Sequence, residues 1–247
     1  MDTFYESDFR VDSRDTDLFG HCRPSAILGF LQESATQAAC ALRFSREEML
    51  EQYNAFWMLA RIRFELKRPL LWDETLRIRT WHRGDRAAMM YREFDLFVGD
   101  EPVGQALSAW VLANQDTRKL MRLGNVKELV GTDGGSLRRT DKLLKLKVPE
   151  DLAPVGQRRL NYSDTDVNGH INNVRYADFA CDALELEQAG RGKFVSSLRV
   201  SYLAECMAGE TIDLLRGTHD GQLYVAGRGK EGKERFDAIL TLDKLAE

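Results

Sequence analysis

The sequence has no run of about 18 consecutive apolar residues, which is what a helix needs to cross a bilayer, so we expect no membrane span. Its first residues, MDTFYESDFR, are acidic and have no apolar centre, so we expect no signal peptide there. Cysteine is scarce, and no two cysteines form a C-x-x-C pair. We interpret them as reduced thiols of a cytoplasmic protein and not as disulfide partners: Cys22, Cys40, Cys181 and Cys206.

An excess of charge of one sign is also lacking. Charged residues make up 30% of the chain, both signs are interspersed, and the net charge is -4. This balance argues against a general nucleic-acid binder, which is usually basic overall. We also expect no metal and no cofactor, because the sequence has no phosphate-binding glycine loop and its four histidines lack clustered ligand spacing: His21, His82, His170 and His219.

The chain does contain an internal repeat. DTDLFGH at 15–21 returns as DTDVNGH at 164–170. A second correspondence follows each copy, because 60–78 and 197–214 both place a basic residue in an alternating apolar run and then open another run with Glu-Thr. With 247 residues, 43% of them hydrophobic, there is room for two small domains. We therefore predict two copies of one module.

Each module has the pattern of one helix followed by antiparallel strands. Helical spacing begins at Pro24 in the first module, and in the second a helix from Val174 to Leu184 can be capped by Asn172 or Asn173. Such a module belongs to the α+β class, with a concave sheet wrapped around a long helix. The expected strands are 57–66, 74–83, 88–98, 103–113, 194–203, 210–217, 221–227 and 234–242.

Between the modules, residues 131–156 are polar and contain glycine and proline, which is typical of a linker. This divides the chain into 1–130, 131–156 and 157–247. Within 138–159, lysine and arginine outnumber the acids, and two interpretations stay open. The stretch is either a solvated linker helix or a docking patch for an acidic partner, with Arg138, Arg139 and Lys142 as its first cations.

The second copy of the repeat concentrates polar groups. Asp166, Asn168 and His170 stand two residues apart, so on an extended loop their side chains point the same way. A carboxylate beside an imidazole fixes its tautomer, and an amide orients water or donates to an oxyanion without titrating. The alternative is a turn with a helix cap, because Asx side chains bond their own backbone and Gly169 suits a turn.

These motifs resemble those of the acyl-acyl-carrier-protein thioesterases. DTDVNGHINNVRY (164–176) is similar to their D-x-N-x-H-x-N-N-x-x-Y segment, and WVLANQDTRKL (110–120) to their W-V-x-x-N-Q-D-T-R-R-L segment. Residues 56–81 resemble a strand pair of their first module, and AEC (204–206) an E-C pair late in the second. The resemblance implies a tandem double hotdog. Plant members begin with a plastid transit peptide, and we expect none here, so the chain is expected to resemble a bacterial member.

The resemblance also implies a reaction, which is hydrolysis of fatty acyl thioesters of acyl carrier protein (ACP) at the end of fatty acid synthesis. It implies a catalytic set of Asp166, Asn168, His170 and Glu205. Glu205 or Asp166 is the base or the attacking carboxylate, while Asn168 and His170 position water and substrate. Backbone N–H groups at the start of the following helix suit the polarised carbonyl: Asn172, Asn173 and Val174.

Other assignments stay open at this point. Cys206 is either a nucleophile or a small buried apolar side chain. In the first module, Trp57, Met58, Met89 and Met90 line the acyl slot or simply pack the core. That module keeps Asp17 and His21 but lacks the amide and, with Pro69 aligned to Glu205, the second carboxylate, so we expect no chemistry there.

The alternatives in function are an acyl-CoA thioesterase, including one acting on aryl or hydroxyacyl groups, and a non-catalytic acyl-binding or regulatory hotdog. A hotdog dehydratase fits the NQDTRKL segment less well. Two modules already supply the pairing that single-hotdog proteins obtain by dimerising, so the sequence leaves the oligomeric state open, a homodimer included. Acyl-chain length is open too.

Overall fold

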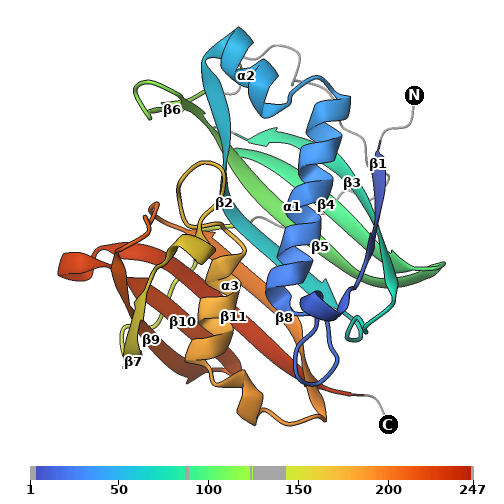
Figure 1. Ribbon diagram of the computed structural model, residues 1–247, viewed down its shortest axis with the longest axis vertical. Helices are drawn as coiled ribbons and strands as arrows, with labels where there is room; N and C mark the ends of the chain where they lie inside the picture. Colours follow the sequence, from blue (N-terminus) through green and yellow to red (C-terminus); the bar gives the residue numbers. More distant parts are fainter. Residues whose placement is uncertain (1–3, 87–88, 123, 125–142, 246–247) are drawn as a thin grey trace.

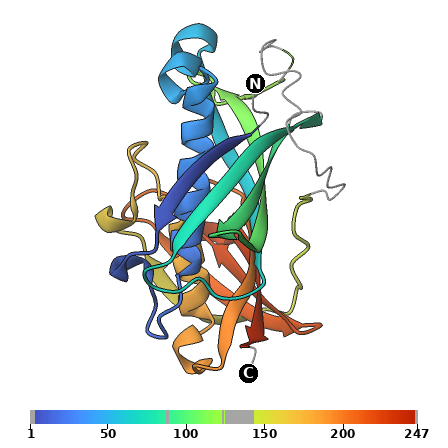
Figure 2. The same ribbon diagram turned by 90° about the vertical axis from the view of Figure 1, so that its right-hand side faces the viewer.

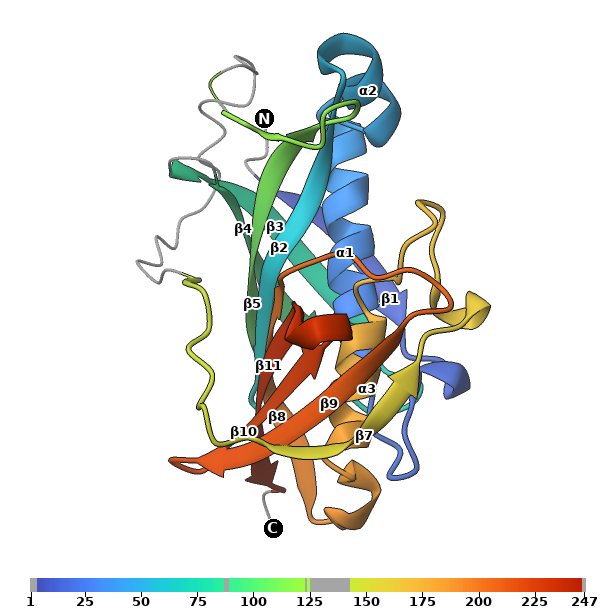
Figure 3. The same ribbon diagram turned by 90° about the vertical axis from the view of Figure 1, so that its left-hand side faces the viewer.

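The computed structural model describes residues 4–86, 89–122, 124 and 143–245. Its main element is an antiparallel sheet of eleven strands that curves around the helices (Figure 1). The helices lie on one face of this sheet, and the segment before β7 runs along the other face (Figures 2 and 3). Among the described residues, no helix is long and apolar enough to cross a membrane.

The two halves of the sheet have the same strand order, reflected about its centre. From the edge inward, the first half consists of β1 (Tyr5–Arg10), β3 (Thr75–Arg86), β4 (Met89–Val98), β5 (Glu101–Asn114) and β2 (Ala55–Leu66). From the centre outward, the second half consists of β8 (Lys193–Tyr202), β11 (Glu234–Lys244), β10 (Gln222–Arg228), β9 (Thr211–His219) and β7 (Ala153–Arg159). The short β6 (Leu120–Met121) pairs with β5.

The halves join through β2 and β8, which pair from Arg61↔Ser201 to Glu65↔Ser197. Side chains of a strand alternate between faces, so Ile62 and Phe64 point to the helix side together with their partners Val200 and Leu198. All four are at most 1% exposed and belong to one core cluster with residues of both halves. The sheet and its core are therefore continuous across the junction.

Helix α1 (Pro24–Ala41) begins with proline at its first turn, where the missing N–H costs nothing. Its buried residues follow the helical spacing expected from the sequence. Helix α3 (Arg175–Ala183) lies beside it under the second half, and α2 (Arg46–Tyr53) follows α1 (Figure 1). Short 3-10 turns occupy η1 (Ser13–Asp15), η4 (Tyr162–Asp164), η5 (Leu186–Gln188) and η6 (Lys230–Gly232).

The eight strands and two helices expected from the sequence are present, with four strands or α-helices besides: β1, α2, β6 and β7. The proposed linker was drawn too long, because β7 begins at Ala153 and pairs with β9. Residues 143–149 have no regular secondary structure, so a linker helix is wrong for this part. Arg138, Arg139 and Lys142 lie outside the described residues.

Candidate active site

A cavity of about 670 Å³ lies between the two halves. Its second-half wall consists of the loop 166–173 and the end of β8 with the residues that follow, up to Glu205. Its first-half wall consists of residues of α1, β2, β3, β4 and β5, of the start of α2 with the two residues before it, and of the segment 115–120. Of the expected catalytic residues, Asp166, Asn168, His170 and Glu205 all line it.

The repeated string forms the same turn in both copies. The Asp166 N–H donates to the His170 carbonyl at 2.9 Å, and Asp166 Oδ1 accepts the Asn168 N–H at 2.8 Å. Asp17 makes the matching bonds to the His21 carbonyl and the Phe19 N–H, both at 2.8 Å. Gly169 and Gly20 have φ of +76° and +84°, which glycine adopts without strain. The turn interpretation therefore holds for the shared aspartate and glycine.

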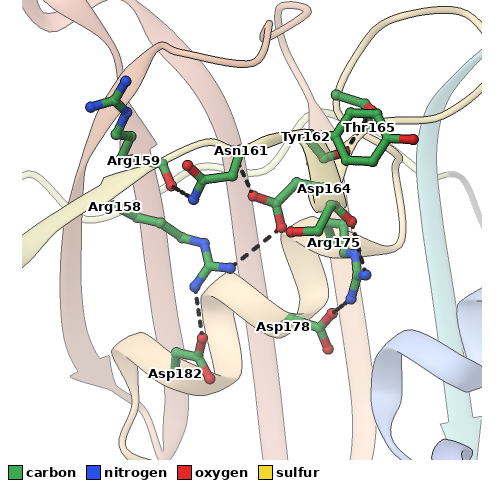
Figure 4. A network of polar contacts seen from close by, with 10 residues as sticks. Arg158, Arg159, Asn161, Tyr162, Asp164, Thr165, Arg175, Asp178 and Asp182 are labelled. Carbon is green, nitrogen blue, oxygen red and sulfur yellow. Dashed lines mark hydrogen bonds and ion pairs between the residues drawn. The ribbon is translucent and has the colours of Figure 1, made fainter.

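The residues before this turn are anchored to α3 and β7 (Figure 4). Asp164 is 4% exposed and accepts the Asn161 N–H at 2.9 Å. Arg158 on β7 lies 3.5 Å from Asp164 and 3.1 Å from Asp182 of α3, while its guanidinium stacks on Phe179. A buried carboxylate shared between a backbone donor and a guanidinium is well compensated, so this network fixes the start of the loop.

Two isolated backbone contacts bring Glu205 beside the loop. His170 pairs with Met207, and the Ile171 N–H donates to the Cys206 carbonyl at 2.9 Å. As a result, His170 Nε2 lies 3.5 Å from Glu205 Oε2. Their side chains are 21% and 44% exposed, so the pair stands at the cavity wall within reach of water. A carboxylate and an imidazole at this distance can exchange a proton through a substrate water.

The expected oxyanion donors need correction. Helix α3 begins at Arg175, and Val174 occupies its N-cap position, where an aliphatic side chain cannot cap. The Val174 N–H already donates to Asn172 Oδ1 at 3.2 Å, so it is not free for a substrate. Asn173 does line the cavity, and its carbonyl accepts the Tyr202 hydroxyl at 3.1 Å. Asn168 and Asn173, which both line the cavity, therefore remain the candidate donors to an oxyanion.

Cys206 is not suited to attack a thioester. It is fully buried, and burial raises the pKa of its thiol. Only the thiolate is a good nucleophile, so a raised pKa leaves the group protonated and weakly reactive. The thiol belongs to the same core cluster as Tyr176, which agrees with the small buried side chain considered from the sequence.

The four residues expected to hold an acyl chain, Trp57, Met58, Met89 and Met90, all line the first-half wall. The WVLANQDTRKL segment turns through Asn114, whose Oδ1 accepts the Thr117 N–H at 2.9 Å, and brings Arg118 to the same cavity. Several lining residues had no signal in the sequence, because they meet only through strand pairing and helix packing: Gln32, His82, Arg92 and Tyr202.

The first copy of the motif faces a cavity of only about 40 Å³. His21 is 8% exposed, and the Cys22 N–H donates to the Leu70 carbonyl as that of Ile171 does to Cys206. This places Pro69 where the second copy has Glu205. The first copy thus has no carboxylate at that position and no room for an acyl thioester.

Two family models match the chain. The acyl-ACP thioesterase N-terminal domain matches residues 2–129, and the acyl-ACP thioesterase C-terminal domain matches residues 154–238. The chain belongs to the acyl-ACP thioesterase family. The turn at 15–21 therefore lies in the N-terminal domain of this family, and the turn at 164–170 lies in the C-terminal domain.

Similar proteins include plant members of the family. The oleoyl-acyl carrier protein thioesterase of Coriandrum sativum is 25% identical over 236 residues, which cover 85% of this chain and 62% of that protein. The palmitoyl-acyl carrier protein thioesterase of Gossypium hirsutum is 26% identical over 243 residues, covering 92% and 53%. The chain thus spans between half and two thirds of the length of these curated relatives.

Two solved structures share the fold along almost the whole chain. An acyl-ACP thioesterase from Bacteroides thetaiotaomicron matches with a TM-score of 0.86 and 22% identity, covering 98% of both chains. The 12:0-ACP thioesterase from Umbellularia californica matches with a TM-score of 0.85 and 18% identity, again covering 98% of both. The chain therefore has the hotdog-like fold of this family, with an antiparallel sheet and few helices.

Proposed function

We propose that the chain hydrolyses fatty acyl thioesters of ACP to free fatty acid and ACP, and so ends fatty acid synthesis in the cytoplasm. The observation that carries the proposal is the shared cavity. His170 and Glu205 stand in one wall of it, 3.5 Å apart, and the first half contributes apolar side chains such as Trp57, Met58 and Met90 to the opposite wall. A thioester bound beside His170 and Glu205 can extend its acyl chain along the cavity, between α1 and the strands of the first half.

We further infer that the two halves are tandem hotdog modules, 1–130 and 157–247, of which the first holds the acyl chain and the second carries the chemistry. The reflected strand order and the duplicated turn support this division. Each module supplies the other with the neighbour that closes its sheet edge, so a single chain is sufficient for one site. A homodimer is compatible with this arrangement and is not required by it.

In the proposed reaction, Glu205 removes a proton from water while the water oxygen attacks the thioester carbonyl carbon. His170 positions that water, and the amide of Asn168 or Asn173 donates to the developing oxyanion. Collapse of the tetrahedral intermediate breaks the carbon–sulfur bond, and the proton passes to the departing thiolate. Glu205 is preferred to Asp166 as the base because Asp166 Oδ1 already accepts a backbone N–H.

Attack by Glu205 itself, through a mixed anhydride that water then hydrolyses, uses the same residues. A single turnover in ¹⁸O-labelled water identifies the anhydride route when the label is recovered in Glu205. The label appears only in the fatty acid if Glu205 is a base, and is found in Glu205 after the turnover if the anhydride is hydrolysed at the enzyme carbonyl. Both routes need no residue outside the described cavity.

The experiment that tests the function is a rate panel across acyl-chain lengths, on ACP and on CoA. We expect Asn168→Ala and His170→Ala each to lower turnover at least about 10²-fold with little change in stability. Glu187→Gln, an exposed carboxylate away from the cavity, is the matched control for Glu205→Gln. Near-normal rates in the Asn168 and His170 variants would remove the assigned site, and faster CoA hydrolysis would favour the acyl-CoA thioesterase alternative.

A further inference from the structure

The end of the cavity that is farthest from Glu205 is partly polar, and it is called the polar end below. Its lining residues come in turn from β2, β5, β4 and β3, which follow β8 in the order of the sheet. On β4 and β3 the lining residues are Arg92 and His82 together with the apolar Met89 and Met90; Arg92 and His82 are cross-strand partners and are 3% and 6% exposed. A slot for a plain hydrocarbon would be expected to end on apolar side chains.

Arg92 has hydrogen-bonding capacity that the protein leaves unused. A guanidinium has five N–H donors, and within the described part of the chain the one bond of Arg92's side chain is from Nη1 to Thr80 Oγ1 at 3.3 Å. Burial lowers the pKa of Arg92 to about 10, which still leaves it charged near neutral pH. Burying a cation without a carboxylate partner is costly in free energy. A ligand that accepts hydrogen bonds from Arg92 would offset this cost.

Other side chains of the same cavity supply acceptors and a second donor. Burial and the charge of Arg92 lower the pKa of His82 to about 3, so its ring is neutral and offers one N–H and one bare nitrogen. From α1, Gln32 lines the same cavity, and its Oε1 is buried without a hydrogen-bond partner in the described structure. Trp110 is not available, because its Nε1–H donates to Ser108 Oγ at 2.8 Å.

We propose that this polar end binds a hydroxyl group carried on the acyl chain far from the thioester. The hydroxyl oxygen accepts from Arg92, and its O–H donates to Gln32 Oε1 or to the bare nitrogen of His82. A hydroxyl is the smallest group that both accepts and donates, so it satisfies both kinds of unused partner at once. A methyl end would leave all of them unpaired. The inference rests on the proposed thioesterase function and specifies its substrate.

The position of the hydroxyl follows from the sheet. Arg92 is on β4, three strands from β8, and strands lie about 4.8 Å apart, so the distance is roughly 14 Å. A zigzag of carbon–carbon bonds of about 1.5 Å advances roughly 1.3 Å per carbon, which places the hydroxyl on the order of ten to twelve carbons from the thioester. The β-hydroxyl of an elongation intermediate is much too close to the thioester to reach Arg92.

The test compares three ACP thioesters of one chain length: dodecanoyl, β-hydroxydodecanoyl and ω-hydroxydodecanoyl. We expect kcat/KM for the ω-hydroxy chain to exceed that for the plain chain at least about 10-fold, with no such gain from the β-hydroxyl. Arg92→Met should remove the preference, and Gln32→Leu should reduce it. Arg199→Met, a partly buried arginine on the opposite face of the sheet, is the control and should keep it.

Equal or slower hydrolysis of the ω-hydroxy chain by the unaltered protein would overturn the inference, whether or not the Arg92 variant folds. Retention of the preference in a folded Arg92→Met protein would overturn it as well. Calorimetric binding of free ω-hydroxydodecanoic and dodecanoic acids gives a readout without turnover. If no thioester is hydrolysed, the proposed thioesterase function is wrong. Even then, tighter binding of the hydroxy acid than of dodecanoic acid would support a hydroxyl site at the polar end. Equal binding of the two acids would contradict that site.

Discussion

At the residue scale, two carboxylates are candidates for the base, and the bonds that each already makes distinguish them. Asp166 holds the turn through its Oδ1, whereas Glu205 lies beside the loop, with its Oε2 3.5 Å from His170 Nε2. We expect Glu205→Gln to lower turnover at least about 10²-fold, because an amide cannot take a proton from water. Asp166→Asn keeps an oxygen acceptor for the turn, so its loss should be smaller. The measurement is the initial rate of both variants on one ACP thioester. A larger loss in Asp166→Asn than in Glu205→Gln would assign the base to Asp166.

His82 makes stability depend on pH. Its pKa is lowered from 6.5 to about 3 in the folded protein, so as pH falls the unfolded chain takes up a proton that the folded chain does not. The stability is therefore fully present above pH 6.5 and is lost as pH falls toward the folded pKa. From about pH 7.5 to about pH 5.5 we expect a loss of about 1.4 kcal/mol from this group.

The measurement is urea unfolding at both pH values for the unaltered protein and for His82→Gln. Glutamine does not titrate, so the variant should lose about 1.4 kcal/mol less across this interval. Equal losses would mean that His82 is protonated in the folded protein. The control is His219→Gln, because His219 lies at the surface beside Asp151, 3.0 Å away.

The sequence predicted the local part of the site and not the part that depends on distant strands. Asp166, Asn168 and His170 lie within one loop, so their spacing alone suggested that they converge. Glu205 was assigned only through the family resemblance, because the backbone pairing of His170 with Met207 has no local signal. Arg92 and His82 were missed for the same reason, since strand register brings them together.

At the scale of elements, the duplicated turn has two different consequences. Asp17 Oδ1 accepts two backbone N–H groups, those of Phe19 and His21, while Asp166 Oδ1 accepts that of Asn168. We expect Asp17→Ala to destabilise the protein by about 1–3 kcal/mol, because buried donors lose their acceptor, and to leave turnover mostly intact. Asp166→Ala should cost less stability and much more turnover. Urea unfolding and initial rates on the same two proteins test this pair.

A parallel variant isolates the chemistry of the first copy. Asp17→Asn combined with His21→Ala keeps an acceptor in the turn and removes both ionisable groups. Turnover should stay mostly intact, because Pro69 stands where a carboxylate would be needed. A collapse as large as that of His170→Ala, in a protein that remains folded, would show that the first copy takes part in the reaction.

Element boundaries show why the rest of the fold escaped prediction. Helix α1 was recognised because its apolar positions repeat at helical spacing and proline opens it. Helix α2 carries a capping box, with Ser45 accepting the Glu48 N–H, which is a usable signal that was overlooked. Strand β7 has mostly exposed side chains at the sheet edge, so its residues look like a loop until β9 pairs with them.

At the scale of the whole molecule, the site exists only because the two halves form one sheet. The wall that contains His170 and Glu205 comes from the second half and the wall that contains Trp57 and Met90 from the first, and the β2–β8 pairing joins the two halves. One turn motif is thereby used twice, once with a large cavity and once with almost none. The two copies therefore differ in the residues and the cavity that face the turn, while the backbone of the turn is the same in both.

The molecule as a whole is acidic, with a net charge of -4, so the proposed binding of an acidic carrier would depend on a local basic surface. We expect reversal of Arg138, Arg139 and Lys142 to glutamate to lower kcat/KM on the ACP thioester about 10-fold or more at low salt, and to leave the CoA ester unchanged. Attraction between exposed charges is screened over about 10 Å at 0.1 M salt, so the effect should shrink as salt rises.

The matched control reverses three exposed cations elsewhere, Arg191, Lys230 and Lys233, and so changes the net charge by the same amount. If docking is local, only the first triple variant loses activity on the carrier, because the second leaves the 138–142 stretch intact. Equal losses in both variants would mean that net charge governs encounter. Equal losses on the ACP and CoA esters would place the stretch in the hydrolytic step and remove it as a carrier surface.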